Sequence, residues 1–406
     1  MPTKMMKKTI LSVIAASMLA ISIPAAQQTS AAASFKDVPA SHWAKTAIEQ
    51  AVAKGYFKGY ADGTFKPGAQ VTRAEFAVLL DRVSTNPATG TAGSFADLSG
   101  SWSEAGVKDA AAKGFITSAD YPNGFKPSTP LTRKEMAKWM TSGLAAADTD
   151  YKQAMSDTAE TVIPVAEYFK KTLSKSDYPY VSVALGTGLM SGYADGNFGP
   201  AKTTTRAEAA VILMRLADVQ KQGADTFTGL KELRAVGTTG TNLNVLTNLN
   251  TGVTPFKNVQ FKPMKFRNGG GRLTLNYFIV VDTRNWTNKK GIYQSVFVAD
   301  SDDKGNENEY YRVYEQQTIY PTVKEFSIGN YMNSSLDTLA VGMAIRNDLP
   351  KKFGYLTLPT TEAKKVFSKY VGNESGMNVW VSNFISVKNP HETYQASDGS
   401  FFGISS

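Results

Sequence analysis

The sequence predicts a multidomain protein with a mainly helical, repeated N-terminal half and a mostly β, sandwich-like C-terminal half. Three observations support this prediction. Short motifs recur three times between residues 34 and 218, helical apolar spacing accompanies each copy, and strand-like runs follow residue 256. A chain of 406 residues is long enough for several hydrophobic cores, so separate domains are expected.

The first 33 residues predict a signal peptide. Lysines precede the apolar run from Ile10 to Ile23, and Ala31-Ala32-Ala33 offers a small-residue cleavage site. The alternative is a membrane anchor, but roughly 20 apolar residues are needed to span a bilayer and this run is shorter. We therefore expect residues 1–33 to be removed and the secreted chain to insert into no membrane.

The composition narrows the possible chemistry. The chain has no Cys, which excludes disulfides and thiolate metal sites, and only His42 and His391 can supply an imidazole. The net charge of +9 is spread along the chain rather than gathered in a basic block, which argues against a nucleic-acid partner and suits an anionic one. We expect no metal, no cofactor and no catalytic residue.

Three motifs recur at matching offsets. The first copy has Phe35-Lys36-Asp37, Phe65-Lys66-Pro67 and Thr72-Arg73-Ala74-Glu75. The second has Phe95-Ala96-Asp97, Phe125-Lys126-Pro127 and Thr132-Arg133-Lys134-Glu135. The third has Met155-Ser156-Asp157, Phe198-Gly199-Pro200 and Thr205-Arg206-Ala207-Glu208, with an insertion before its turn. The expected modules are residues 34–84, 94–144 and 151–218.

Each copy predicts two helices around a glycine-rich turn. In the first copy, the apolar residues at helical spacing are Trp43, Ala47, Ile48, Ala51 and Val52, then Phe76, Ala77, Leu79, Leu80 and Val83. A unit of this size buries little surface alone, so the copies should pack on one another. Residues 84–93 and 145–154, rich in small and polar side chains, are expected to join them.

The Thr-Arg-x-Glu pattern predicts a capping box at the start of each second helix. The predicted capping residues are Thr72, Glu75, Thr132, Glu135, Thr205 and Glu208. Capping does not explain the arginine, because a cation in the first turn opposes the helix dipole. Arg73, Arg133 and Arg206 therefore suggest an anionic ligand. The alternative is an ion pair between copies, to Asp37, Asp97 or Asp157.

These motifs resemble the S-layer homology (SLH) domain. The resemblance rests on Phe35-Lys36-Asp37-Val38-Pro39, His42-Trp43-Ala44, Gly59-Tyr60-Ala61-Asp62-Gly63-Thr64-Phe65 and Val71-Thr72-Arg73-Ala74-Glu75-Phe76. It implies a pseudo-threefold helical trimer that binds the secondary cell wall polymer of Gram-positive bacteria. It also implies that Arg73, Arg133 and Arg206 meet the pyruvate ketal carboxylate of that polysaccharide in grooves between modules, which would place the protein at the cell wall or S-layer surface.

Aromatic and glycine positions extend the expected ligand site. Trp43 and Trp102 could offer an apolar platform to a sugar face, although a Trp at helical spacing more often belongs to the core. Gly59 and Gly192 could allow close backbone approach. The second copy departs from the pattern in its turn at residues 118–124, and the third lacks the early Trp, where Tyr178 or Tyr180 could stand in. The three grooves should therefore differ.

The second half predicts a linker and then a sandwich-like domain. Residues 219–255 are polar and predict a linker with one short helix at residues 230–235, and residues 256–406 predict the β-domain. The expected strands are residues 273–281, 293–299, 310–314, 339–345 and 379–385, with a helix at residues 361–370. We recognise no family resemblance in this part from its residues, and its partner cannot be predicted from the sequence.

Three local features of the second half resemble ligand or catalytic sites, but we expect turns and solvated carboxylates there. Residues 300–305 lack the ligand pattern of a calcium loop, and residues 268–271 lack the Lys and helix of a phosphate loop. A glycosidase-type pair could come from Glu309, Glu315, Glu325 and Asp337. We expect a wall-anchored binding or structural protein. The alternatives are a wall- or polysaccharide-acting enzyme on the same anchor and an S-layer subunit.

Overall fold

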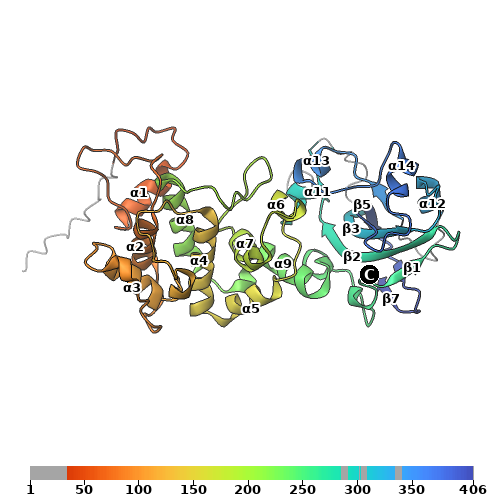
Figure 1. The fold of residues 1–406 in the computed structure, drawn as a ribbon, viewed down its shortest axis with the longest axis horizontal. Coiled ribbons are helices and arrows are strands. Elements are labelled where there is room, and N and C mark those ends of the chain that lie inside the picture. Colours follow the sequence, from red (N-terminus) through yellow and green to blue (C-terminus); the bar gives the residue numbers. More distant parts are fainter. Residues whose placement is uncertain (1–33, 285–290, 301, 303–308, 334–340, 406) are drawn as a thin grey trace, which may run out of the picture.

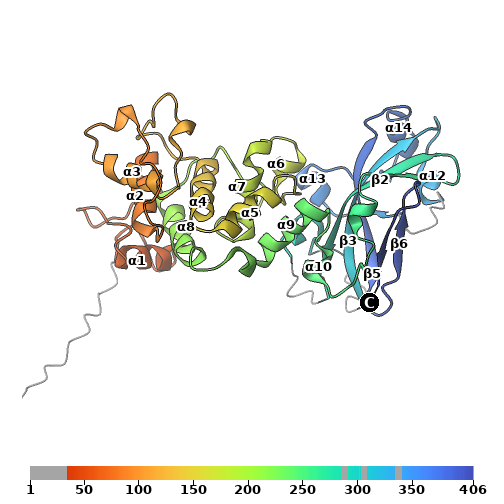
Figure 2. The ribbon, with the colours of Figure 1, turned by 90° about the horizontal axis from the view of Figure 1, so that it is seen from below.

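The structure is a computed structural model that describes residues 34–284, 291–300, 302, 309–333 and 341–405. The expected signal peptide, most of the 300–305 turn and Asp337 lie outside these residues. The molecule is elongated, with the helical half at one end and the sheet at the other (Figures 1 and 2). Within the described part, no helix is both long and apolar enough to cross a bilayer.

The helical half contains two principal helices per copy. They are α1 (Lys45–Ala53) and α2 (Arg73–Val83), α3 (Glu104–Ala112) and α4 (Arg133–Ala147), and α7 (Tyr178–Gly186) and α8 (Arg206–Val219). Further helices are α5 (Thr149–Asp157), α6 (Ala166–Phe169), α9 (Thr228–Thr239) and α10 (Leu243–Leu246), with 3₁₀ turns at Ala96–Leu98, Ser118–Asp120, Lys175–Asp177, Ala224–Thr226 and Phe256–Asn258. One continuous hydrophobic core runs through all three copies. The expected packing of copy on copy is therefore present.

A ring of backbone hydrogen bonds closes the three copies around one axis. The amide of Leu131 donates to the carbonyl of Val71 at 2.8 Å, the amide of Thr204 donates to Leu131 at 3.1 Å, and the amide of Val71 donates to Thr204 at 2.9 Å. Val71, Leu131 and Thr204 each directly precede the threonine that caps the following helix. The three helix starts are therefore held at equivalent positions around the ring.

Two joining segments differ from expectation. Residues 145–154 form the end of α4 and most of α5, where Tyr151 and Ala154 are buried against the third copy. Residues 219–255, expected to be a linker with one short helix at residues 230–235, carry the longer helix α9 over that range, and its buried face packs on α5 and α7. Leu230 and Leu233 on α9 are fully buried, so apolar packing rather than polar composition decides the structure here.

The C-terminal half is built on an antiparallel sheet with strand order β1-β2-β3-β5-β4. Its strands are β1 (Pro263–Lys265), β2 (Gly271–Val281), β3 (Tyr310–Pro321), β4 (Met343–Ala344) and β5 (Met377–Ser386), and a separate hairpin contains β6 (Glu392–Gln395) and β7 (Phe401–Ile404). The helices are α11 (Gln294–Phe297), α12 (Ile328–Met332), α13 (Leu349–Phe353) and α14 (Ala363–Ser368). The mostly β character is confirmed.

Two layers of different kinds cover the sheet. On one face, Phe278 of β2 packs against Tyr394 and Phe402 of the hairpin, with α10, α12 and α14 alongside. On the other face, Trp380 of β5 packs against α11, α13 and the helices α6 and α9 of the first half. The sandwich-like pairing of sheets is thus limited to one face, and the helical half supplies part of the opposite layer.

One expected strand is wrong. Residues 293–299 form the short helix α11, and its Phe297 stacks on Tyr314 with ring centroids 4.6 Å apart. A short apolar run is compatible with either a buried strand or a buried helix, and here the packing on the sheet selects the helix. The expected strand at residues 339–345 is reduced to β4, and part of that range lies outside the described residues.

Candidate functional site

The three repeated arginines reach across the boundaries between copies. Each is the first residue of its helix, α2, α4 or α8, and each helix begins with the capping box formed by the preceding threonine and the glutamate three residues later. The threonine oxygen accepts the glutamate amide and the glutamate carboxylate accepts the threonine amide, which fixes the first turn. The arginine side chain is then directed at the turn of the next copy.

Arg133 and Arg206 make the same contacts at two of these boundaries. The Nε of Arg133 donates to the carbonyl of Phe198 at 2.9 Å and its Nη2 donates to that of Ser191 at 2.7 Å. The Nε of Arg206 donates to the carbonyl of Phe65 at 2.9 Å and its Nη2 donates to that of Lys58 at 3.1 Å. The two arginines are only 5% and 8% exposed. The hydrogen bonds of each guanidinium therefore link its own copy to the neighbouring one.

Aromatic rings and a second cation complete these two boundaries. Arg133 lies 4.7 Å from the ring centroid of Tyr193, and the Lys202 ammonium lies 3.8 Å from the same ring. Arg206 lies 5.0 Å from Tyr60, with the Lys66 ammonium 4.0 Å away from that ring. Among the described residues, no carboxylate is within ion-pair distance of either arginine. Two positive charges thus flank one tyrosine at each boundary.

Arg73 at the remaining boundary has its own counter-ion. Its Nε donates to Glu135 Oε1 at 2.8 Å, its Nη2 lies 2.6 Å from the same oxygen, and its Nη1 donates to the carbonyl of Phe125 at 2.9 Å. Glu135 is also the capping glutamate of α4. The ion pair between copies, considered as an alternative, therefore exists for Arg73, but its partner is Glu135 rather than Asp37, Asp97 or Asp157.

A cavity of about 790 Å³ opens at the Arg73 boundary. Its charged lining residues are Arg73, Lys126, Lys134, Lys138, Asp120, Glu135 and Asp177. Most of these charges are already paired, since Lys138 lies 2.7 Å from Asp120 and Lys134 lies 3.9 Å from Asp177. The cavity is therefore large but close to electrically neutral.

The backbone amides at the helix starts are not available to a ligand. The amide of Arg73 donates to the carbonyl of Thr129, that of Arg133 to Lys202 and that of Arg206 to Ala69. The turn of the next copy accepts these bonds, so no arginine amide at the three helix starts is left unpaired to hold an anion. Any anion held here must be bound by side chains.

The acidic residue that opens each copy supports the turn rather than the arginine. The carboxylate of Asp37 accepts the amides of Phe65 and Lys66, and that of Asp97 accepts the amides of Phe125 and Lys126. Burial opposes ionisation of both carboxyls, but these two donors outweigh it and lower the pKa of each.

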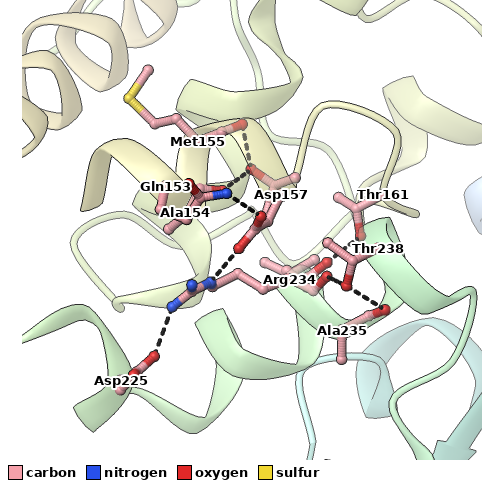
Figure 3. Close-up of polar contacts among 11 residues, drawn as sticks. Gln153, Ala154, Met155, Asp157, Thr161, Asp225, Arg234, Ala235 and Thr238 are labelled. Atoms are coloured by element: carbon pink, nitrogen blue, oxygen red, sulfur yellow. Dashed lines mark hydrogen bonds and ion pairs between the residues drawn. The ribbon is translucent and has the colours of Figure 1, made fainter. Parts of the chain in front are cut away.

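In the third copy this role belongs to Glu167, not to Asp157. Glu167 accepts the amides of Phe198 and Gly199 at 2.8 Å each. Asp157 ends α5 and pairs with Arg234 of α9 at 2.8 Å, while Arg234 also contacts Asp225 (Figure 3). The repeat spacing of 60 residues misplaced the start of this copy, because α5 is an added helix that carries a chance Asp at the repeat position.

The expected sugar platforms are exposed. Trp43 is 66% and Trp102 is 70% exposed, so neither is a core residue, and both precede their helices rather than lying on them. The Trp43 ring stacks on His42 with centroids 5.8 Å apart. Neither indole lines the cavity at Arg73.

The two expected glycines have different surroundings. A side chain at Gly59 would meet the Phe35 ring at 2.2 Å, so the close approach there is to the protein's own core. At Gly192 the nearest atom is the Asn197 carbonyl at 3.3 Å, which is a tight but tolerable distance. Gly59 is therefore explained by packing on Phe35.

The candidate glycosidase carboxylates of the second half are not assembled into a pair. Glu315 is fully buried on β3 and accepts hydrogen bonds from Gln317 and Tyr394. Burial raises its pKa to about 7, and these donors only partly offset that effect. Glu309 and Glu325 pair at the surface with Lys388 and Lys364. The 268–271 segment forms the expected turn, between β1 and β2.

The residues that distinguish the boundaries could not be predicted from the sequence. Glu135 was recognised only as a cap, and Tyr60, Tyr121 and Tyr193 were not assigned to the arginines that lie over them. The one available signal was the altered turn of the second copy, where the tyrosine is displaced by one position relative to the repeat. The contacts join residues more than 45 positions apart, which no local pattern reveals.

Comparison with known proteins agrees with this arrangement. The S-layer homology domain matches at residues 34–77, 94–137 and 171–210. An S-layer protein of Bacillus thuringiensis subsp. finitimus is 30% identical over 229 residues, 56% of this chain and 26% of that protein. A cellulosome-anchoring protein of Acetivibrio thermocellus is 36% identical over 107 residues, 25% of this chain and 24% of that protein.

The similarity also extends to an enzyme. An amylopullulanase of Thermoanaerobacterium thermosulfurigenes is 30% identical over 185 residues, which are 45% of this chain and 9% of that protein. The chain thus spans about a quarter or less of the length of these three relatives. The matched segments coincide with the three copies that the backbone ring closes, so the N-terminal part of this chain consists of three tandem S-layer homology domains.

Proposed function

We propose that the three SLH domains anchor this protein non-covalently to the bacterial cell wall by binding an acidic wall polysaccharide. The relatives named above include an S-layer protein and a cellulosome-anchoring protein, which supports anchoring at a cell surface. The observation that carries the proposal is the pair of buried arginines at the domain boundaries that have no carboxylate partner within the described part of the chain. The ligand we propose is a pyruvylated secondary cell wall polymer.

Two of the three boundaries are better suited than the third to bind an anion. An arginine stays protonated when buried, so a buried guanidinium held only by carbonyls and rings gains most from an external anion. At Arg133 and Arg206 the neighbouring Lys202 and Lys66 add a second positive charge. A carboxylate on a polysaccharide could bridge the two cations there, with a sugar ring against the tyrosine. These two boundaries are the proposed principal binding sites.

The Arg73 boundary is less favoured as a binding site for the polysaccharide. Glu135 already neutralises Arg73, and the other charges around that cavity are largely paired. An incoming carboxylate would have to compete with Glu135 for the guanidinium. Trp43, Trp102 and Gly192 remain proposed polysaccharide contacts at the exposed edges of the domains. Gly59 is the least favoured of the proposed contacts, because its neighbour is Phe35.

Co-sedimentation of the full chain with purified cell walls tests this proposal. Walls that retain the polymer should bind the protein, walls stripped of the polymer should not, and walls whose pyruvate ketals have been removed by mild acid should bind much less. Undiminished binding to stripped walls would rule out the polysaccharide mechanism. Equal binding to depyruvylated walls would leave polysaccharide anchoring intact and rule out the pyruvate contact.

Conservative variants locate the contact. Arg133→Lys and Arg206→Lys keep the charge but lose the planar fork, so both should weaken wall binding. Arg82→Lys is the matched control, because Arg82 lies on the exposed side of α2 and makes one hydrogen bond to the carbonyl of Tyr56. If Arg82→Lys weakens binding as much as the other two, the boundary arginines are not the contact.

The alternative of an enzymatic C-terminal half has less support. The three candidate carboxylates that the structure describes have different surroundings, because one is fully buried and the other two pair with surface lysines. A retaining or inverting glycosidase needs two carboxyl groups facing one substrate. We therefore propose a binding or structural role for this half. A sugar-release assay on wall polysaccharide would test it, since turnover that Glu309→Gln or Glu325→Gln abolishes would make the protein an enzyme.

A further inference from the structure

A second cavity lies where the third SLH domain meets the sheet. Its volume is about 840 Å³, within the roughly 300–1,000 Å³ typical of ligand sites. Residues of α6 and α7 line one side, and residues of β3, β5 and the segments before and after α14 line the other. Figure 1 places α6 beside the C-terminal half. The cavity thus depends on both halves and is separate from the boundaries between SLH domains.

The floor and one wall of this junction cavity are aromatic. Tyr355 and Trp380 are buried beneath it, and Phe169 packs on them with centroid distances of 5.2 and 6.2 Å. Tyr168 and Tyr178 stand half-buried in the wall, 5.4 Å apart between centroids. Flat aromatic faces with polar tips suit ligands that are apolar on one face and hydroxylated at the edge.

Several polar atoms of the lining have no partner within the part of the chain that the structure describes. The hydroxyls of Tyr168, Tyr178 and Tyr370 make no hydrogen bond there. Burial raises the pKa of Tyr168 and of Tyr178, so both hydroxyls stay protonated and can donate as well as accept. Asn378 donates through its amide to Thr318, which leaves its oxygen as an acceptor. The lining therefore presents both donors and acceptors.

The charge of the lining is positive. Among the residues that the structure describes, the lining contains Lys171 and Lys175 and no Asp or Glu. Lys175 pairs with Glu160 at 2.6 Å, whereas Lys171 has no carboxylate within ion-pair distance among the described residues. Lys171 also has φ +58°, a conformation that costs a non-glycine residue free energy. A glycine would relieve this strain, so the lysine side chain itself is the feature to explain.

We propose that the junction cavity binds a short anionic oligosaccharide. Its sugar rings would pack against Tyr168 and Tyr178, its hydroxyls would bond to the tyrosine hydroxyls and Asn378, and its negative group would meet Lys171. The absence of carboxylates from the lining favours binding without cleavage. This inference does not depend on polymer binding at the SLH boundaries.

Calorimetric titration of the full chain tests the proposal with two defined probes. Trigalacturonate is an anionic trisaccharide and maltotriose is a neutral one of the same length. Trigalacturonate should bind, and maltotriose should bind more weakly by about fivefold, the upper value for one exposed ion pair. No binding of trigalacturonate, or equal affinity for both sugars, overturns the proposal.

Three variants place that binding in the cavity. Lys171→Gly removes the charge and suits the left-handed backbone, so the fold is kept and trigalacturonate affinity should fall about fivefold. Asn378→Asp adds a repelling charge and should lower it further. Lys152→Ala, on the exposed face of α5 and outside the cavity, is the control with the same charge change. If all three variants bind trigalacturonate alike, the sugar is bound elsewhere and the proposal fails.

Discussion

The SLH domains and the part of the chain that follows them bury ionisable side chains of opposite kinds. The SLH domains bury Arg133 and Arg206 at their boundaries, whereas α9 and the C-terminal sheet bury Glu232 and Glu315. Burial raises the pKa of both glutamates to about 7, despite hydrogen bonds that oppose the shift. A buried carboxyl group can take up a proton and lose its charge, but an arginine cannot. A buried arginine therefore implies a partner, while a buried glutamate does not.

The Arg73 boundary shows the other solution to the same problem. There a carboxylate of the next domain, Glu135, supplies the counter-ion, and the guanidinium needs no ligand. The equivalent capping glutamates Glu75 and Glu208 serve only their own helices among the described contacts. One sequence motif thus produces one internally neutralised boundary and two that retain positive charge.

The largest expected effect is the loss of stability when a buried arginine is removed. Arg133→Ala and Arg206→Ala each leave two carbonyls of the next domain without donors, so we expect about 2–5 kcal/mol of destabilisation each. Urea unfolding measures it, with Arg82→Ala as the exposed control. Stabilities equal to that control would mean that the arginines do not hold the domains together.

The buried glutamates should make the free energy of unfolding fall as the pH rises. With pKa values near 7 in the folded chain and ordinary values when unfolded, Glu232 and Glu315 bind more protons in the folded state. Their contribution to stability is therefore complete below about pH 4.5, falls progressively as the pH rises from there, and is lost once the pH has passed 7, by on the order of 1–3 kcal/mol per group. Urea midpoints at pH 5.5 and 8 measure the loss. Glu315→Gln should reduce it, and an unchanged pH dependence in this variant would remove Glu315 from the explanation.

A smaller effect should appear when the Arg73 boundary is made like the other two. Glu135→Gln keeps a side-chain oxygen for the capping box and removes the counter-ion of Arg73, so wall binding should strengthen about three- to tenfold. Glu75→Gln and Glu208→Gln are matched controls, because they alter caps that pair with no boundary arginine. The measurement is co-sedimentation with polymer-bearing walls. Equal changes in all three variants would argue against the ion pair as the reason that the boundaries differ.

The smallest change in stability is expected for the exposed indoles. Trp43→Ala and Trp102→Ala should alter the unfolding free energy by less than about 0.5 kcal/mol, because both side chains are largely in solvent. Wall binding should nevertheless weaken if the rings contact sugar. His42→Ala is a neighbouring control. Wall binding that is unchanged in both Trp variants would remove the two indoles from the proposed contact surface.

The sequence by itself determined the features that depend on short separations. The capping boxes join residues three positions apart, and the apolar stripes of α2, α4 and α8 repeat every three or four residues, so both could be predicted from the printed sequence. The same holds for strands β2, β3 and β5. Regular local geometry converts directly into sequence spacing, and this is why the domain type could be recognised.

Only the tertiary structure decided which residues meet across long separations. Arg73 finds Glu135 62 positions away, and Arg206 finds Phe65 141 positions away. The fold also gives the role expected of Asp157 to Glu167, and it packs α9, expected only as a short helix within a linker, on α5 and α7. Such contacts depend on how whole helices are placed around the backbone ring and against the sheet, because burial and charge pairing are set by three-dimensional neighbours and not by position along the chain.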